Sequence, residues 1–260
     1  MAILEMHGLS KIFGGLTALN KLDLNIFEGE IFGLVGPNGS GKTTWINIVT
    51  GFLKPSAGDI LYKGQSIVGL APYQVAERGI IRTFQLTSIF SNLTAKENII
   101  TGRYLKTRHS NTGSFLRSIF NTSDYRDEES RLSQKGDEIL ATVEMEEKGD
   151  VTAKNLPTVD QRKLEIAIAL AGEPGLLLLD EPAAGMNPEE VDRVMQLIQT
   201  LQRSGITLAV IEHNMKVITG ICTHVAVINY GNKIAEGTPE EVINNKAVIS
   251  SYLGEAPQNA

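Results

Sequence analysis

Apolar residues along the chain follow two spacings, one typical of strands and one typical of helices. Residues 22–27 alternate apolar and polar positions, whereas residues 31–35 and 176–179 are continuous apolar runs and residues 206–211 are nearly so. Alternation is typical of a strand with one buried face, and a short continuous run is typical of a strand buried on both faces. The pattern therefore predicts an antiparallel piece near the N-terminus and buried parallel strands later in the chain.

Between these strands the apolar spacing becomes helical. A helix is expected through residues 45–49, and a mostly buried helix is expected over residues 164–170. Asn187 is a good N-cap and Pro188 suits a first helical turn, so a further helix is expected to run to about Arg203. Strands that alternate with helices predict an α/β fold with a mostly parallel sheet, to which the early strands add an antiparallel β part.

Composition narrows the class of protein. The chain has 260 residues, of which 42% are hydrophobic and 21% are charged, and this fits a globular protein with a sizeable core. The net charge of −6 argues against a general nucleic-acid binder, so no nucleic-acid partner is expected. Cys222 is the only cysteine, which excludes an internal disulfide and suits a reducing compartment. We expect its side chain to be a small buried group.

The chain carries no obvious membrane or secretion signal. No stretch approaches the roughly 18 to 20 apolar residues that a membrane-spanning helix needs. The first residues lack a basic start followed by an apolar region, so no signal peptide is expected. Any association with a membrane is therefore expected to come through partners.

Residues 103–135 differ in character from their surroundings. They are rich in Ser, Thr, Asn and Arg, and from Arg103 to Arg117 they include basic residues and no acidic ones. Two interpretations stay open, a solvated loop and a surface that faces a partner or a membrane. From Tyr125 onward a charged helix is expected.

The strongest chemical signal is a glycine-rich loop between the strand at 31–35 and the helix that follows it. The loop fits G-x-x-x-x-G-K-[ST], and its residues are Gly36, Pro37, Asn38, Gly39, Ser40, Gly41, Lys42, Thr43 and Thr44. Glycines permit positive φ, so successive N–H groups can point at a phosphate, and the helix N-terminus favours the same anion. Lys42 can reach the β- and γ-phosphates, and Thr43 can ligate Mg²⁺. A chance glycine-rich turn is disfavoured because the strand and the helix both fit, so the loop predicts a nucleoside triphosphate site.

An acidic pair follows the buried run at 176–179. At the end of a buried strand Asp180 can hold the Mg²⁺ shell, and Glu181 is placed to orient or deprotonate an attacking water. The alternative is an acidic pair that caps the next helix. The phosphate loop upstream favours the catalytic interpretation.

Two further polar residues follow strands. His213 follows the strand at 206–211, and ligands of an α/β sheet sit at the carboxyl ends of its strands. It could therefore contact the γ-phosphate, although a lone histidine at a strand end is usually structural or solvated. Gln85 follows a short apolar run, and on its own it indicates only a polar residue at a strand end.

The order of the phosphate loop, Gln85, Asp180-Glu181 and His213 resembles the ATP-binding subunit of an ATP-binding-cassette (ABC) transporter over nearly the whole chain. The resemblance implies ATP and Mg²⁺ as ligands. It implies that Gln85 senses Mg²⁺ and the transmembrane subunits and that His213 is the switch histidine. It also implies that Phe13 stacks on adenine, which is physically reasonable for an aromatic ring, whereas a core position is the alternative for Phe13.

Finer matches resemble the subunits that serve branched-chain amino acid uptake. The matching segments are residues 13–19, 82–85, 180–188, 211–216 and 251–256. This subgroup implies a second, different ATP-binding subunit, two transmembrane permease subunits and an extracytoplasmic solute-binding protein. It also implies a peripheral place at the cytoplasmic face of the plasma (inner) membrane. Related systems carry other neutral amino acids, or urea and short amides, and these cargoes stay open.

The resemblance also implies a single ABC ATPase domain over residues 1–260. Residues 1–85 and 172–260 would form the nucleotide-binding core with its β subdomain, and residues from about 86 to 171 would form a helical subdomain. A soluble cassette ATPase acting on DNA or ribosomes is the competing class, and the acidic net charge and the single phosphate loop argue against it. A small P-loop kinase would not explain Asp180-Glu181 and His213 together.

One family motif departs from its usual pattern. The signature L-S-G-G-Q corresponds here to Leu156-Pro157-Thr158-Val159-Asp160, before a helix expected to start near Leu164. In the family this segment presents backbone N–H groups to the γ-phosphate held by the opposite subunit, and glycines allow the close approach. Val159 would crowd that approach, and Asp160 would bring a negative charge to it. We therefore predict that this subunit completes its partner's ATP site poorly.

Overall fold

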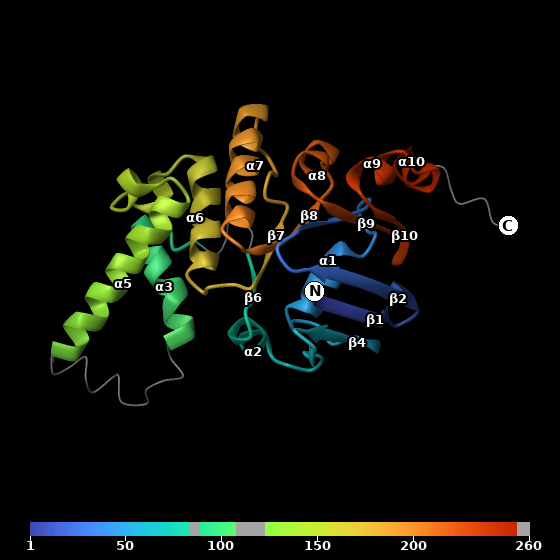
Figure 1. The fold of residues 1–260 in the computed structure, drawn as a ribbon, viewed down its shortest axis with the longest axis horizontal. Coiled ribbons are helices and arrows are strands. Elements are labelled where there is room, and N and C mark those ends of the chain that lie inside the picture. The colour runs from blue at the N-terminus through green and yellow to red at the C-terminus, as the bar shows by residue number, and fades with distance from the viewer. Residues whose placement is uncertain (84–88, 108–122, 254–260) are drawn as a thin grey trace. The chain divides into compact units, whose positions relative to one another are not determined.

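The computed structural model describes residues 1–83, 89–107 and 123–253. The chain forms two compact units, one from Met1–Arg82 and Gly175–Ala260 and the other from Thr83–Pro174. The strands of the described residues belong to the first unit, and the second unit is helical (Figure 1). Two distant segments of the sequence therefore build the first unit, and one continuous segment builds the second.

The first sheet of the first unit is antiparallel and has the strand order β2-β1-β4-β5. Its strands are β1 (Ala2–Phe13), β2 (Leu16–Phe27), β4 (Ala57–Tyr62) and β5 (Gln65–Ser66). In β2 the side chains of Leu22, Leu24 and Ile26 are buried and those between them are exposed, as the alternating pattern predicts. The expected antiparallel part is thus confirmed.

The second sheet has the order β10-β9-β3-β8-β7-β6. Its strands are β3 (Ile31–Val35), β6 (Ile80–Arg82), β7 (Leu176–Asp180), β8 (Thr207–Glu212), β9 (His224–Asn229) and β10 (Asn232–Gly237). Neighbours run parallel except β10, which is antiparallel to β9. The predicted mostly parallel α/β sheet is confirmed. Because β3, β8 and β7 are parallel neighbours, the residues that follow them lie at one edge of the sheet.

Helices of the first unit begin and end close to where the sequence places them. They are α1 (Lys42–Val49), α2 (Pro72–Glu77), α7 (Pro188–Arg203), α8 (Met215–Ile221), α9 (Pro239–Ile243) and α10 (Lys246–Leu253). Asn187 caps α7 by accepting the N–H of Glu190, and the Glu190 carboxylate accepts the N–H of Asn187 in return. On α1 the fully buried Trp45 donates its indole N–H to the Met6 sulfur at 3.1 Å, which joins the helix to the antiparallel sheet. The fold therefore fixes α1, and with it the phosphate loop, from both sheets.

The second unit contains α3 (Ala95–Thr107), α5 (Ser123–Thr142) and α6 (Thr158–Leu170), with 3₁₀ turns at Glu146–Lys148 and Ala153–Asn155. Thr94 and Glu97 form a capping box at the start of α3. The expected start of α6 near Leu164 is wrong, because Pro157 is the N-cap and helical hydrogen bonding begins with the Gln161 N–H donating to the Pro157 carbonyl. In the segment 103–135, α3 covers residues 103–107 and α5 covers residues 123–135. Residues 108–122 lie outside the described part. None of the described helices is long and apolar enough to cross a membrane.

Candidate nucleotide site

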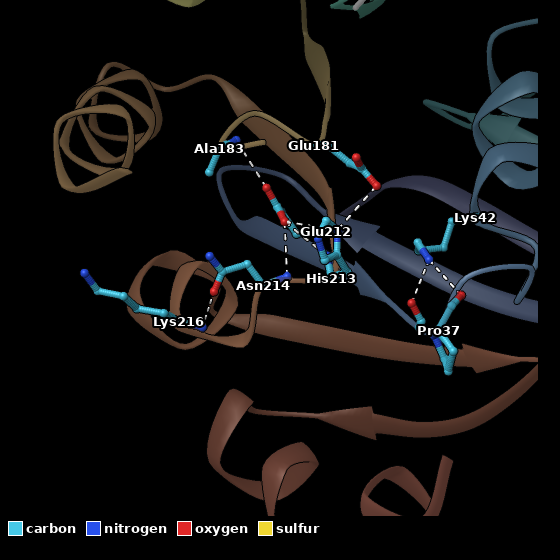
Figure 2. Close-up of polar contacts among 9 residues, drawn as sticks. Pro37, Lys42, Glu181, Ala183, Glu212, His213, Asn214 and Lys216 are labelled. Atoms are coloured by element: carbon cyan, nitrogen blue, oxygen red, sulfur yellow. Dashed lines mark hydrogen bonds and ion pairs between the residues drawn. The ribbon is translucent and has the colours of Figure 1, made fainter. Parts of the chain in front are cut away.

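The phosphate loop leaves the carboxyl end of β3 and leads into α1, as predicted. The Lys42 ammonium donates to the carbonyl oxygen of Gly36 at 2.6 Å and to that of Pro37 at 3.0 Å (Figure 2). Burial lowers the pKa of Lys42, and nearby carboxylates, Glu181 foremost, act in the opposite direction. The loop thus holds a partly desolvated ammonium on two carbonyls, and phosphate oxygens are stronger acceptors than either.

Two glycines of this loop are required by their surroundings. A Cβ on Gly36 would lie 2.1 Å from the carbonyl oxygen of Ile228, and one on Gly41 would lie 2.6 Å from that of Ala18. Gly41 also has a φ of 113°, which a side chain would strain. The buried Ser40 hydroxyl finds no hydrogen-bond partner among the described residues. A tight backbone cradle with an unsatisfied hydroxyl fits a phosphate group, which supplies acceptor oxygens.

Asp180, at the end of β7, is held by an arginine that the sequence analysis did not single out. Arg82 donates to the Asp180 carboxylate at 2.6 Å and to the Asn47 amide oxygen at 2.8 Å. Only 13% of each partner's side chain is exposed in this Arg82–Asp180 pair, so the contact is shielded from water. The Thr43 hydroxyl and the Asp180 carboxylate are hard oxygen donors of the kind that Mg²⁺ prefers.

Glu181 follows β7 in an unusual backbone conformation. Its φ is 48°, and its N–H donates to the Ile211 carbonyl at 2.9 Å, which links the loop after β7 to β8. Its Oε1 lies 3.4 Å from Nδ1 of His213 (Figure 2). The structure therefore brings together two predicted site residues from neighbouring strands. The alternative that Asp180-Glu181 caps the next helix is wrong, because Asn187 caps α7.

Glu212 is a further buried group at this edge of the sheet. Its carboxylate accepts the N–H of Ala183 at 3.2 Å, of His213 at 3.1 Å and of Asn214 at 3.2 Å (Figure 2). Its side chain is only 1% exposed. Glu212 thus connects the loop that carries Glu181 to the loop that carries His213. The sequence analysis predicted the neighbouring His213 as a site residue and missed Glu212. The feature that marks Glu212 is the burial of its side chain, which the sequence pattern does not show.

A cavity of about 400 Å³ lies against the phosphate loop. Residues 38–44 and Glu181 line it, together with the side chains of Phe13, Leu16 and Tyr230. Phe13 is 44% exposed, so the alternative of a core position for this ring is wrong. The Lys11 ammonium lies 5.0 Å from the Phe13 ring centroid, which leaves the ring partly engaged by a cation. Sequence analysis gave neither Leu16, which lies in the matching segment 13–19, nor Tyr230 a role at this site, and only the folded chain places them at the cavity.

Other sequence predictions fall elsewhere. Gln85 lies outside the described residues. Val159 and Asp160 are buried within the second unit, and the Lys148 ammonium donates to the Asp160 carboxylate at 2.5 Å. The Asp160 carboxylate is therefore paired with Lys148, and the expectation that Asp160 brings a negative charge to the partner's triphosphate stays a prediction. Val159 is buried in the first turn of α6, and its expected crowding of the partner's γ-phosphate also stays a prediction.

Two family models match the chain. One described as ABC transporter matches residues 19–184, and one described as branched-chain amino acid ATP-binding cassette transporter matches residues 232–257. The chain belongs to the ABC transporter family. The resemblance identified from the sequence is confirmed, as are the predicted ATPase class and the P-loop α/β fold.

Individual relatives of this cassette are similar over their full length. It is 41% identical over 255 residues to the high-affinity branched-chain amino acid transport ATP-binding protein BraF of Pseudomonas aeruginosa, with 98% of each chain covered. It is 40% identical, with the same coverage, to the protein LivG of Escherichia coli strain K12, which has the same description. A solved structure described as the ADP conformation of MJ1267, an ATP-binding cassette of an ABC transporter, matches with a TM-score of 0.84. That pair is 29% identical and covers 98% of this chain and 100% of the other.

Proposed function

We propose that this cassette is the ATP-binding and ATP-hydrolysing subunit of an importer for branched-chain amino acids. The observation that carries the proposal is a cavity that the phosphate loop and Glu181 line together. Similarity to BraF and LivG, whose names specify branched-chain amino acid transport, supports the cargo. Other neutral amino acids, or urea and short amides, are the alternative cargoes.

In this proposal the loop at 36–44 binds the triphosphate through its N–H groups and Lys42. Thr43, Asp180 and Gln85 would hold Mg²⁺, which when bound neutralises part of the phosphate charge. Glu181 orients or deprotonates the attacking water, because its carboxylate is partly exposed at the cavity. Phe13 stacks on the adenine ring.

His213 and Glu212 position Glu181 in the proposed mechanism. The His213 Nδ1 lies 3.4 Å from the Glu181 carboxylate, and His213 would also contact the γ-phosphate. Its neighbour Glu212 fixes the backbone on both sides of the pair. Positioning and charge stabilisation, without a covalent intermediate, then account for catalysis.

The proposed assembly contains two transmembrane permease subunits, a second and different ATP-binding subunit, and an extracytoplasmic solute-binding protein. This chain would sit peripherally at the cytoplasmic face of the plasma (inner) membrane. Family membership supports the permease partners. The departed signature at Leu156–Asp160 supports a different second subunit, because two copies of this chain would share the same altered segment. We also propose residues 1–85 and 172–260 as the nucleotide-binding core, and residues 86–171 as the helical subdomain that faces the permeases.

A tagged pull-down from detergent-solubilised native membranes tests the assembly. We expect two permeases and a second ATP-binding protein to be recovered with this chain. The solute-binding protein encoded with them then gives the cargo for a binding assay with leucine, isoleucine, valine, urea and acetamide. Recovery of ribosomes or nucleic acid in place of membrane proteins would contradict the transport function and favour a soluble ABC ATPase.

A further inference from the structure

The turn between β9 and β10 places an aromatic side chain in a backbone conformation that disfavours it. Tyr230 and Gly231 form this two-residue turn with φ values of 45° and 77°. Positive φ at both positions is the pattern of a hairpin turn that prefers Asn-Gly, because asparagine and glycine tolerate the left-handed region. A tyrosine at the first position carries a steric cost that asparagine would avoid. Strain of this kind is often retained where a side chain has a function.

The same turn is fixed onto the phosphate loop. The Gly231 N–H donates to the Ser40 carbonyl at 2.9 Å, and the Gly231 carbonyl accepts the N–H of Asn20 at 2.9 Å. A Cβ on Gly231 would lie 2.7 Å from the carbonyl oxygen of Ala18. The Tyr230 backbone therefore keeps its position relative to the residues that bind phosphate.

Tyr230 lines the nucleotide cavity together with Phe13 and Leu16, and it is 74% exposed. Phe13 lies on the strand β1 and Tyr230 on the β9–β10 turn, so the two aromatic residues of the cavity come from different sheets. The Lys11 ammonium lies against the Phe13 ring and occupies part of its surface. A nucleotide base is transferred from water most favourably onto an apolar surface, so a second ring would add to the contact that Phe13 offers.

We propose that Tyr230 is a second aromatic contact for the base of the bound nucleotide, acting beside Phe13. The proposal rests on ATP binding at this cavity. An adenine ring gains from each aromatic surface that it covers, and a turn anchored to Ser40 presents this ring without further ordering. In this proposal the strained tyrosine is retained because its ring increases the affinity for the nucleotide.

The test compares two ligands with and without a base. Full-length Tyr230→Asn keeps a residue suited to positive φ, and we expect it to bind ATP about fivefold or more weakly than the wild type. Binding of inorganic triphosphate, measured by the same calorimetric titration with Mg²⁺ present, should not change. Tyr230→Phe, which keeps the ring, should bind ATP as the wild type does.

Lys63→Asn is a matched control. Lys63 and Gly64 form a turn between β4 and β5 with similar φ values of 50° and 74°, and Lys63 does not line the cavity. Both asparagine variants should be at least as stable to heat as the wild type, and only Tyr230→Asn should lose ATP affinity. Wild-type ATP affinity in Tyr230→Asn, or an equal loss for triphosphate, would overturn the role of Tyr230. Failure of the wild type to bind either ligand would instead overturn the nucleotide site itself.

Discussion

The carboxylate of Glu212, the last residue of β8, accepts the backbone N–H of Ala183 in the loop after β7 at 3.2 Å. The same carboxylate accepts the N–H of His213, so one buried charge ties the loop after β7 to the loop after β8. Glu181 lies two residues before Ala183, and its side chain meets His213 within 3.4 Å. We infer that the distance between the proposed catalytic groups is set by a residue that does not itself line the cavity.

Glu212→Gln should lower kcat for ATP hydrolysis by about 10- to 100-fold while leaving the KM for ATP nearly unchanged. The amide keeps the volume of the side chain, but its NH₂ group cannot accept a backbone N–H, so one loop loses its anchor. Steady-state ATPase assays of the purified complex measure both constants. Glu240→Gln, at an exposed position on α9, is the control and should behave as the wild type. Loss of stability with an unchanged kcat would show that Glu212 is only structural.

Glu181→Gln should bind ATP with wild-type affinity and hydrolyse it roughly 10²- to 10⁴-fold more slowly. The substitution keeps the shape of the side chain and removes the carboxylate that orients the water. His213→Ala should lower the rate as well, and the double variant should lose less than the two single losses combined, because the two groups act as a unit. Fully additive losses in this double-mutant cycle would contradict the functional pairing of Glu181 and His213.

Lys42→Ala should abolish the stabilisation that ATP gives to the chain. Bound ATP raises the unfolding free energy of the wild type by an amount that depends on the ATP concentration relative to Kd. A thermal unfolding scan with and without Mg-ATP measures this increase. The variant should unfold at a similar temperature to the ligand-free wild type, since burial already disfavours the Lys42 charge. An equal ATP-induced shift in the variant would show that the nucleotide binds elsewhere.

Cys222 should stay unreactive to thiol reagents in the folded chain. Burial raises its pKa to about 12, with the charges of Glu212 and Glu30 acting in the same direction. The group favours folding fully below its ordinary thiol pKa near 9, and this contribution is lost as pH rises through the folded value. The difference in unfolding free energy between the wild type and Cys222→Ala should therefore shrink as the pH is raised above that range. Rapid labelling at neutral pH without unfolding would contradict the buried thiol.

Restoring glycines at Thr158 and Val159 should raise the ATPase activity of the assembled complex, if the altered signature limits the partner's site. The structure adds a cost, because glycine disfavours helix and Val159 is buried, so unfolding free energy should fall by about 1–3 kcal/mol. Activity must therefore be normalised to folded complex. Thr158→Ala with Val159→Ala is the control, since it removes side-chain volume without permitting the closer approach. No gain from the glycines would show that the signature is not limiting.

Local patterns predicted the parts of the site that follow one another in sequence. The phosphate loop and Asp180-Glu181 each adjoin an apolar strand. The hydrophobic period of the strand and the position of the motif after it were therefore enough to predict both. Arg82 escaped prediction because its partner Asp180 is 98 residues away. Tyr230 sits in a short turn without a motif, and its link to Ser40 depends on the order of strands in the sheet.

The departed signature shows a second limit. The residue types at Val159 and Asp160 predict crowding and a negative charge at the partner's site, but they could not show that Val159 is buried or that Asp160 pairs with Lys148. The start of α6 was misplaced for a different reason, since Pro157 ends the preceding turn and begins the helix earlier than the apolar run does. The ion pair and the burial depend on tertiary contacts, whereas the earlier start of α6 follows from a local proline that the apolar period does not register.

ATP-driven uptake by the reconstituted complex tests the central proposal most directly. Proteoliposomes that contain the two permeases, both ATP-binding subunits and the solute-binding protein would be loaded with ATP and supplied with labelled leucine. We expect leucine to accumulate with the wild-type chain and uptake to fall with Glu181→Gln, in parallel with ATP hydrolysis. Hydrolysis of ATP without uptake of any branched-chain amino acid would contradict the proposed function.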